Sequence, residues 1–207
     1  MDIEYRGANC VQIITKGGTV VTDPNLKELG LKDVPVGKVD VFLLTQAMEI
    51  NAGEAFVIDS AGEYEVKGFS VRGMATRAHM GDEKNKNTTM YRVANGDTKI
   101  AITGHMFADI TDEQLETLGI IDVLVIPVGG FGYTMDAIGA AKMVRKIDPR
   151  VVIPTHYADD ATTYPVDQAS LDDFVKELGA PVVEEDKLKI KAGSLPESLT
   201  VVKLKRL

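Results

Sequence analysis

Short apolar runs broken by turn residues dominate the first half of the chain. β-Branched and aliphatic residues gather in brief stretches, and glycine pairs or polar turn residues separate them. Such runs predict strands, and Asn95-Gly96 predicts a tight hairpin because both residues tolerate a positive φ. The predicted strands cover residues 2–6, 10–14, 19–22, 39–44, 56–58, 69–73, 88–93 and 99–103.

The second half alternates strands with amphipathic helices. Thr111 and Gln114 form a capping-box pattern, which predicts a helix over 111–118. An apolar stripe predicts a second helix over 134–147, and Ser170 caps a third over 170–178 that stops at Gly179. The stripe of the second helix contains Ala137, Ile138, Ala141, Val144 and Ile147. Further strands are expected over 122–126, 151–153, 187–190 and 199–204, so the pattern favours layered sheets with helices outside.

The composition is that of a globular, acidic protein. Its 207 residues are enough for one domain over 1–207 with a buried core, and the formal net charge is -8. That charge opposes broad binding to nucleic acid or anionic membranes. Cys10 is the only cysteine, so we interpret it as a small buried hydrophobe and expect no intrachain disulfide. With no signal peptide or membrane-length apolar run, the sequence predicts a soluble cytoplasmic protein.

A series of short motifs follows a fixed order along nearly the whole chain. They are Asp23-Pro24, LLT at 43–45, GEYEVKG at 62–68, Asn87-Thr88, Gly104, TDEQLETLG at 111–119, DVLVIPVGG at 122–130 and VVIPTHY at 151–157. In this order the chain resembles the metallo-β-lactamase superfamily, in the branch that includes the ascorbate-phosphate lactonase. The resemblance implies an α/β (α+β) fold, a four-layer αββα sandwich with its site at one edge between the sheets.

The metal-binding motif of that superfamily is altered here. In the family, the strand ending in LLT leads into H-x-H-x-D-H, whose first two histidines bind one metal and whose aspartate and last histidine bind the second. The corresponding positions of this chain carry Gln46, Met48, Ile50 and Asn51. Ala8 replaces a histidine common in related sequences, and His105 stands where the bridging aspartate is expected. We therefore expect no dinuclear zinc site and negligible hydrolysis of lactones or β-lactams.

The chain has only three histidines, and all three fall at positions of the ligand type. In the family the positions of His79, His105 and His156 serve the first metal, the bridge and the second metal. Three imidazoles with one open position form a known catalytic zinc arrangement. Two interpretations stay open: the three histidines hold one zinc or another divalent ion, or they are inherited without a metal role. We expect them to lie together at one edge, facing the loop over 46–51.

The sequence predicts a pocket around these histidines, at the position of the family's metal site. It would contain Asp23, Gln46, Met48, Asn51 and Tyr157. The family's aspartate at the position of Asp23 orients metal ligands; without those ligands, a turn and hydrogen-bonding role is the simpler interpretation. Tyr157 could donate to a ligand or simply pack. Met48 and Ile50 make the loop less polar and favour packing over catalysis.

Other motifs carry weaker signals. Glu63 and Tyr64 are interpreted as part of a solvated hairpin loop, with a pocket or oligomer contact as the alternative. The three glycines at 129, 130 and 132 match neither a Walker loop nor a dinucleotide fingerprint and predict a flexible turn. Asp159-Asp160 predicts a solvated loop, with a metal-site carboxylate as the alternative. No G-x-S-x-G motif is present, which argues against a serine hydrolase of that type.

Two function classes follow from these patterns. The first is a non-catalytic or regulatory descendant that keeps the fold to bind a small molecule or a protein partner, including a second copy of itself. The second is a metal-dependent hydrolase rebuilt around one ion held by His79, His105 and His156. Bound metal with an ordered water favours the second class, and a dry site filled by Met48 and Ile50 favours the first.

Overall fold

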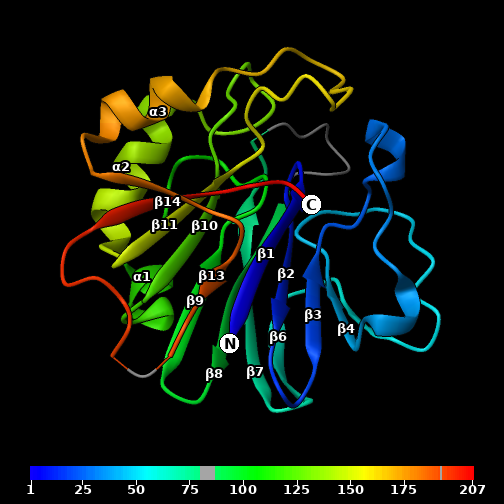
Figure 1. Cartoon of the computed structure of the whole chain (residues 1–207). Helices are drawn as coiled ribbons and strands as arrows, with labels where there is room; N and C mark the ends of the chain where they lie inside the picture. The colour runs from blue at the N-terminus through cyan, green and yellow to red at the C-terminus, as the bar shows by residue number, and fades with distance from the viewer. Residues whose placement is uncertain (80–86, 192) are drawn as a thin grey trace.

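The computed structural model describes residues 1–79, 87–191 and 193–207. Within them the chain forms two β-sheets packed face to face (Figure 1). Alternate side chains of both sheets point inward and form one buried apolar core, because successive residues of a strand face opposite sides. The predicted fold class is confirmed. No helix in the described residues is long and apolar enough to cross a membrane.

The first half of the chain builds most of a six-stranded sheet. Its order is β13 (Leu188–Lys189), β1 (Asp2–Gly7), β2 (Cys10–Ile14), β3 (Thr19–Thr22), β4 (Val41–Leu43) and β5 (Phe56–Ile58). The pairs from β13 to β3 are antiparallel, whereas β3, β4 and β5 run parallel. The apolar run predicted over 39–44 is a shorter central strand, and Cys10 is buried in β2.

The second sheet has eight strands in the described chain. Its order is β12 (Val182–Glu185), β14 (Thr200–Leu204), β11 (Val151–Thr155), β10 (Val123–Pro127), β9 (Thr98–Ile102), β8 (Asn87–Asn95), β7 (Phe69–Arg77) and β6 (Gly62–Val66). Neighbouring strands from β6 through β7 and β8 to β9 pair in antiparallel fashion. Neighbouring strands from β9 through β10, β11 and β14 to β12 pair in parallel. The hairpin predicted at Asn95-Gly96 is confirmed, since Asn95 pairs with Thr98.

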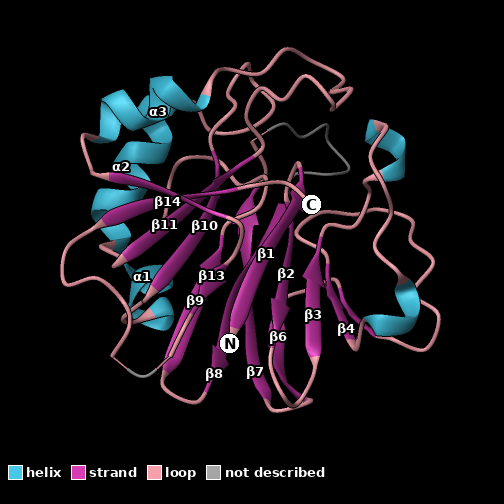
Figure 2. Ribbon diagram, in the orientation of Figure 1, coloured by secondary structure: helices cyan, strands magenta, loops and turns pink. Residues whose placement is uncertain are grey.

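Three α-helices cover the outer face of the eight-stranded sheet, as Figure 2 shows. They are α1 (Asp112–Leu118), α2 (Ala137–Ile147) and α3 (Leu171–Leu178), and their apolar faces form a second core with that sheet. The outer face of the six-stranded sheet carries instead the 3-10 helices η1 (Lys27–Leu29) and η2 (Val36–Lys38), with their loops. In the described chain these loops and short 3-10 helices form the layer outside the six-stranded sheet.

Several local predictions need correction. The second helix begins at Ala137, with Asp136 as its N-cap, so residues 134–136 lie outside it. Ile138 was placed on the buried stripe but is 66% exposed. The segment of Glu63 and Tyr64 is strand β6 and not a hairpin loop. Strand β12 was not predicted, because all of its residues are exposed and leave no apolar alternation.

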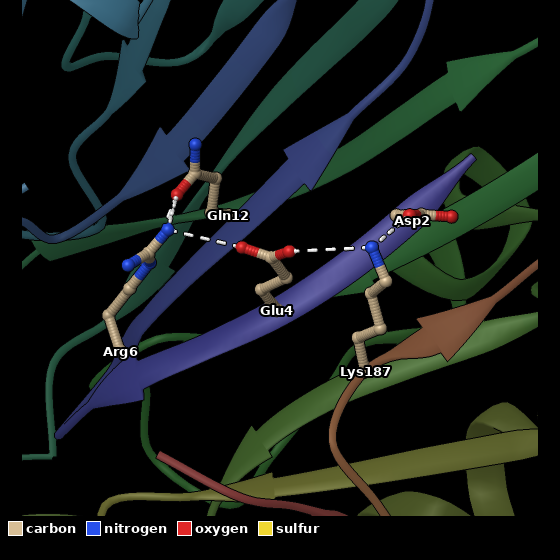
Figure 3. Close-up of polar contacts among 5 residues, drawn as sticks. All are labelled: Asp2, Glu4, Arg6, Gln12 and Lys187. Atoms are coloured by element: carbon tan, nitrogen blue, oxygen red, sulfur yellow. Dashed lines mark hydrogen bonds and ion pairs between the residues drawn. The ribbon is translucent and has the colours of Figure 1, made fainter. Parts of the chain in front are cut away.

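A chain of polar contacts runs along the outer face of β1 (Figure 3). Lys187, just before β13, lies 2.6 Å from Asp2 and 3.8 Å from Glu4. Arg6 bonds to Glu4 at 3.1 Å and to Gln12 on β2 at 2.6 Å. These partly exposed contacts link β1 to β2 and to the segment before β13, and such surface ion pairs add little stability.

The two sheets come close together where Gly104, after β9, faces Thr45, after β4. Gly104 has φ +58°, and a Cβ built there would lie 2.3 Å from the Thr45 side chain. Gly104 therefore satisfies two constraints at once: a left-handed backbone and a close approach between sheets.

We predict that Gly104→Ala lowers the free energy of unfolding by about 2 kcal/mol or more, because both strain and overlap oppose the methyl group. Gly96→Ala is the matched control: Gly96 also has φ +58°, but nothing lies within 4 Å of a Cβ built there. Urea denaturation of both variants separates the two effects. Equal losses would contradict a steric role for Thr45.

Candidate functional site

The candidate site lies where the carboxyl ends of strands from both sheets meet. Asp23 follows β3, Thr45 follows β4, His105 follows β9 and His156 follows β11. Parallel strands deliver the residues that follow them to the same end of a sheet. Thr155 Oγ1, at the end of β11, donates to Asn9 Oδ1 in the β1–β2 turn at 2.8 Å, which joins the two sheets at this edge.

The three histidines reach one region of this edge. The rings of His105 and His156 lie 5.2 Å apart and almost perpendicular, at 85°. The backbone N–H of His79 donates to the carbonyl oxygen of His105 at 2.8 Å, while its ring stacks on Phe107 at 5.5 Å. In residues 1–79, 87–191 and 193–207, no group of three or more His, Cys, Asp or Glu side chains is arranged to hold a metal ion.

Asp23 is the polar hub of the site. Only 1% of its surface is exposed, and its carboxylate accepts from the backbone N–H of Thr45 at 2.7 Å and from Thr45 Oγ1 at 2.6 Å. Asn9 Nδ2 lies 3.4 Å from the same carboxylate. Burial raises the pKa of Asp23 to about 6, against the opposing hydrogen bonds of Thr45 and Asn9, so the group is ionised at neutral pH.

His105 is held by the amide of Asn9. The two groups are 3.3 Å apart, between Asn9 Nδ2 and His105 Nδ1. His105 is 6% exposed, and its Nε2 atom is buried without a hydrogen-bond partner in the described structure. Burial, followed by the neighbouring His156 and His79 rings, lowers the pKa of His105 to about 3. The imidazole is therefore neutral over the physiological range.

His156 is held from the other side by Gln168. His156 Nδ1 lies 2.9 Å from Gln168 Oε1, and the backbone N–H of His156 donates to the carbonyl of Ala8 at 2.9 Å. Burial lowers the pKa of His156 to about 4, although the contact with Gln168 opposes that shift. Gly129 makes room for this arrangement, because a Cβ there would lie 2.0 Å from Gln168 Oε1.

Tyrosine rings enclose the two neutral imidazoles. Tyr133 lies 5.2 Å from the His105 ring and 5.4 Å from the His156 ring, and Tyr164 lies 4.6 Å from His156. Tyr164 and Gln168 also line an open groove of about 500 Å³. Tyr157 stacks instead on Tyr5 at 6.2 Å and packs partly into the core. The edge is thus polar at its centre and aromatic around it.

The loop over 46–51 contributes less than the sequence suggested. Met48 and Ile50 pack on the outer face of the six-stranded sheet, against a third apolar cluster that includes Leu26, Phe42 and Leu44. Asn51 is exposed and accepts from the backbone N–H of Gly53, and Gln46 is half-buried. Of the residues predicted for the pocket, Asp23 is linked to His105 through Asn9, whereas Met48 packs outside the six-stranded sheet.

Sequence reasoning missed several residues of the site. Asn9, Thr45 and Gln168 position the site by hydrogen bonds, while Tyr133 and Tyr164 enclose it. Asn9 stands next to Ala8, a position already singled out, and Thr45 belongs to the LLT motif, so both had a signal. The loop around Gln168 had none, because its approach to His156 arises only in the folded chain.

We predict that His156 makes the protein less stable in acid. A buried neutral histidine stabilises the fold above its unfolded pKa of 6.5, and this contribution is lost as the pH falls toward its folded pKa of about 4. At pH 4.5 the loss is about 2.5 kcal/mol relative to pH 7. Denaturation of the wild type and of His156→Gln at both pH values tests this. The variant should lose less stability on acidification; an identical loss in both proteins contradicts the assignment.

Comparisons with known proteins agree with the fold. A family profile described as a β-lactamase superfamily domain matches residues 2–156. A UPF0173 protein of Pyrococcus furiosus is 24% identical over 202 residues, covering 86% of this chain and 90% of the relative. A UPF0173 metal-dependent hydrolase of Thermococcus onnurineus is 30% identical over 156 residues, covering 74% and 66%. Other matches are partial: the chain covers 29% of a relative in Archaeoglobus fulgidus and 53% of one in Thermoplasma acidophilum.

Solved structures give the same result. A protein of Thermotoga maritima, assigned to the Zn-dependent hydrolases of the metallo-β-lactamase superfamily, superposes with a TM-score of 0.75 at 25% identity, covering 99% of both chains. The metallo hydrolase Igni18 of Ignicoccus hospitalis has a TM-score of 0.67 at 15% identity, covering 99% of this chain and 94% of its own. Because the profile matches 2–156 of 207 residues, the chain belongs to the β-lactamase superfamily, with the metallo-β-lactamase fold and relatives named metal-dependent hydrolases.

Proposed function

We propose that this chain is a non-hydrolytic member of its superfamily that binds a small molecule at the edge lined by His105 and His156. The observation that carries the proposal is the course of the loop over 46–51. Met48 and Ile50, at two positions of the family's ligand motif, pack against the apolar cluster outside the six-stranded sheet. Neither side chain then remains to replace the lost ligands at the site.

The donor chemistry supports the same conclusion. A two-metal centre needs several histidine and carboxylate ligands around both ions. The motif positions here carry Gln46, Met48, Ile50 and Asn51, of which the amides are weak neutral ligands, the thioether is soft and the isoleucine is none. These residues do not fit a dinuclear zinc centre that would drive a two-metal hydrolysis.

The remaining groups suit binding by hydrogen bonds and ring contacts. His105 and His156 are neutral, each is held by an amide, and Tyr133 and Tyr164 lie against them. The adjoining groove of about 500 Å³ is of the size that holds a small organic molecule. A buried, polar centre within an aromatic surround is the usual character of such a site.

A second candidate is a metal-dependent hydrolase with one ion held by His79, His105 and His156. The observation in its favour is that His79 Nδ1 and His105 Nε2 are both buried without a hydrogen-bond partner in the described structure. The names of the relatives place metal-dependent hydrolysis in the family. When bound, one such ion would supply an activated water.

We predict that the purified protein contains well below one metal ion per chain and does not hydrolyse lactones or β-lactams. Mass spectrometry of metal content, before and after dialysis against zinc at neutral pH, measures the first property. Hydrolysis assays with and without added zinc measure the second. The double variant His105→Gln, His156→Gln is the control, and its metal content should equal that of the wild type.

Stoichiometric zinc that is lost in the double variant, together with zinc-dependent turnover, would reverse the proposal. The single-ion hydrolase would then be the function of this site. Zinc retained equally by both proteins would indicate binding away from these histidines and would leave the proposed function standing.

A further inference from the structure

A cavity of about 610 Å³ lies at the edge of the sandwich where β12 and β13 are the last strands of the two sheets. The chain crosses from one sheet to the other through Asp186 and Lys187, and it returns from β13 to β14 through a loop that contains Leu195 (Figure 1). Within the described chain, none of the residues that line the cavity holds or encloses the histidines. A hollow of this volume is of the size that holds a small organic molecule.

The floor of the cavity is the apolar core itself. Val151 and Val202 belong to the buried core between the sheets, and Leu188 and Leu195 pack against it. Val183 pairs in register with Val202 and so faces the same side, but it is 43% exposed. Among the described residues, the apolar side chains of the lining are all aliphatic. Such a surface suits a flexible alkyl chain, because it offers no aromatic ring on which a planar ligand would stack.

The loop on one side of the cavity is held by hydrogen bonds. Arg150 donates from Nε to the carbonyl oxygen of Pro196 at 2.9 Å and from Nη2 to that of Leu195 at 3.1 Å. The backbone N–H of Lys191 donates to Ser194 Oγ at 2.8 Å, which closes a turn in the same loop. The wall is therefore formed before any ligand binds, and this lowers the entropic cost of binding.

Glu185 brings an unpaired carboxylate to this apolar lining. It lies two residues after Val183 on β12, so both residues face the space between the sheets. Its partner in register is Leu204, a core residue that is 2% exposed. Within the described chain the backbone carbonyl of Glu185 accepts from Lys205 at 2.9 Å, but no salt bridge or hydrogen bond involves its carboxylate.

The other charges of the lining have partners or face away from the cavity. Asp186 pairs with Lys205 at 2.8 Å, and Lys187 pairs with Asp2 at 2.6 Å. Lys189 lies opposite Asp2 in register, on the outer face of the six-stranded sheet, because the neighbouring residues of both strands face the core. The carboxylate on β12 is therefore the charge that a ligand in the cavity meets.

We propose that this cavity binds a primary aliphatic amine, with its alkyl chain on the aliphatic floor and its ammonium group paired with Glu185. Removing the exposed part of Val183 from water favours the alkyl chain, and Coulomb attraction favours an ammonium over a carboxylate. The formal net charge of -8 acts in the same direction, because it raises the local concentration of cations. The site is separate from the histidine edge, so the inference holds or fails independently of the proposed function.

Three eight-carbon probes separate the contributions of the chain and of the charge. Octylammonium, octan-1-ol and octanoate share the alkyl chain and differ in their charge at neutral pH. In isothermal titration calorimetry with the full chain, we expect saturable binding of octylammonium, weaker binding of octan-1-ol and the weakest binding of octanoate. Absence of saturable octylammonium binding, or tighter binding of octanoate, overturns the proposal.

Glu185→Gln tests the ion pair. This variant should bind octylammonium about three- to fivefold more weakly, as expected for a partly exposed ion pair, and should bind octan-1-ol as tightly as the wild type. Glu184→Gln is the matched control: it removes the same charge from the same strand, but Glu184 faces the other side and pairs with Lys203 at 2.7 Å. Circular dichroism shows that each variant is folded. If Glu185→Gln dimerises and keeps its affinity, the carboxylate serves only to protect the edge strand from pairing with another chain, and the proposal fails.

Val183→Phe tests the position of the site. The larger side chain enters the cavity and should weaken the binding of octylammonium about tenfold or more. Val182→Phe is the matched control, because Val182 is the neighbouring residue and is 40% exposed, but it faces the opposite side of β12 and does not line the cavity. Equal losses in the two variants, or a loss in neither, place the ligand elsewhere and refute the proposed site.

Discussion

A buried carboxylate at the end of β3 holds together the segments on which the site depends. Asp23 accepts two hydrogen bonds from Thr45 and faces the amide of Asn9, which in turn bonds to Thr155 of the other sheet. Burying a charge is costly unless it is well hydrogen-bonded, so these contacts offset a desolvation penalty that still raises the pKa of Asp23. Any change that frees Asp23 also frees the turn that positions His105.

Amides, and not charged groups, orient both imidazoles of the site. Asn9 contacts His105 and Gln168 contacts His156, and burial keeps both rings neutral. In metal centres a histidine commonly bonds through its second nitrogen to a group that fixes its tautomer. The same physical device operates here, with an amide as the partner of each ring. The centres of the two rings lie 5.2 Å apart at this edge of the sandwich.

The outer face of the six-stranded sheet explains the course of the loop over 46–51. In the described chain no α-helix covers the apolar side chains of Val21, Leu26 and Phe42 on that face. Met48 and Ile50 supply part of the cover, and burying such side chains contributes about 1.5–3 kcal/mol each when complete. Packing of Met48 and Ile50 on that face thus accounts for their removal from the site.

Local patterns in the sequence determined layered sheets, the three helices and the hairpin at Asn95-Gly96, because periodicity, caps and turn residues act within a few residues. The resemblance to the superfamily implied the two-sheet sandwich and the placement of the histidines at one edge. It also indicated that the chain departs from a two-metal motif. Strand β12 escaped detection because it is exposed on both faces and has no apolar alternation.

Only the tertiary structure decided which side chains surround the histidines. The spacing of Met48 and Ile50 shows that they share a side of the chain, but which surface they cover depends on what other segments leave uncovered. Gln168 reaches His156 only because Gly129 leaves space for it, and Asn9 reaches His105 only because the sheets face each other. Contacts between residues distant in sequence arise from packing, and local sequence patterns carry no record of them.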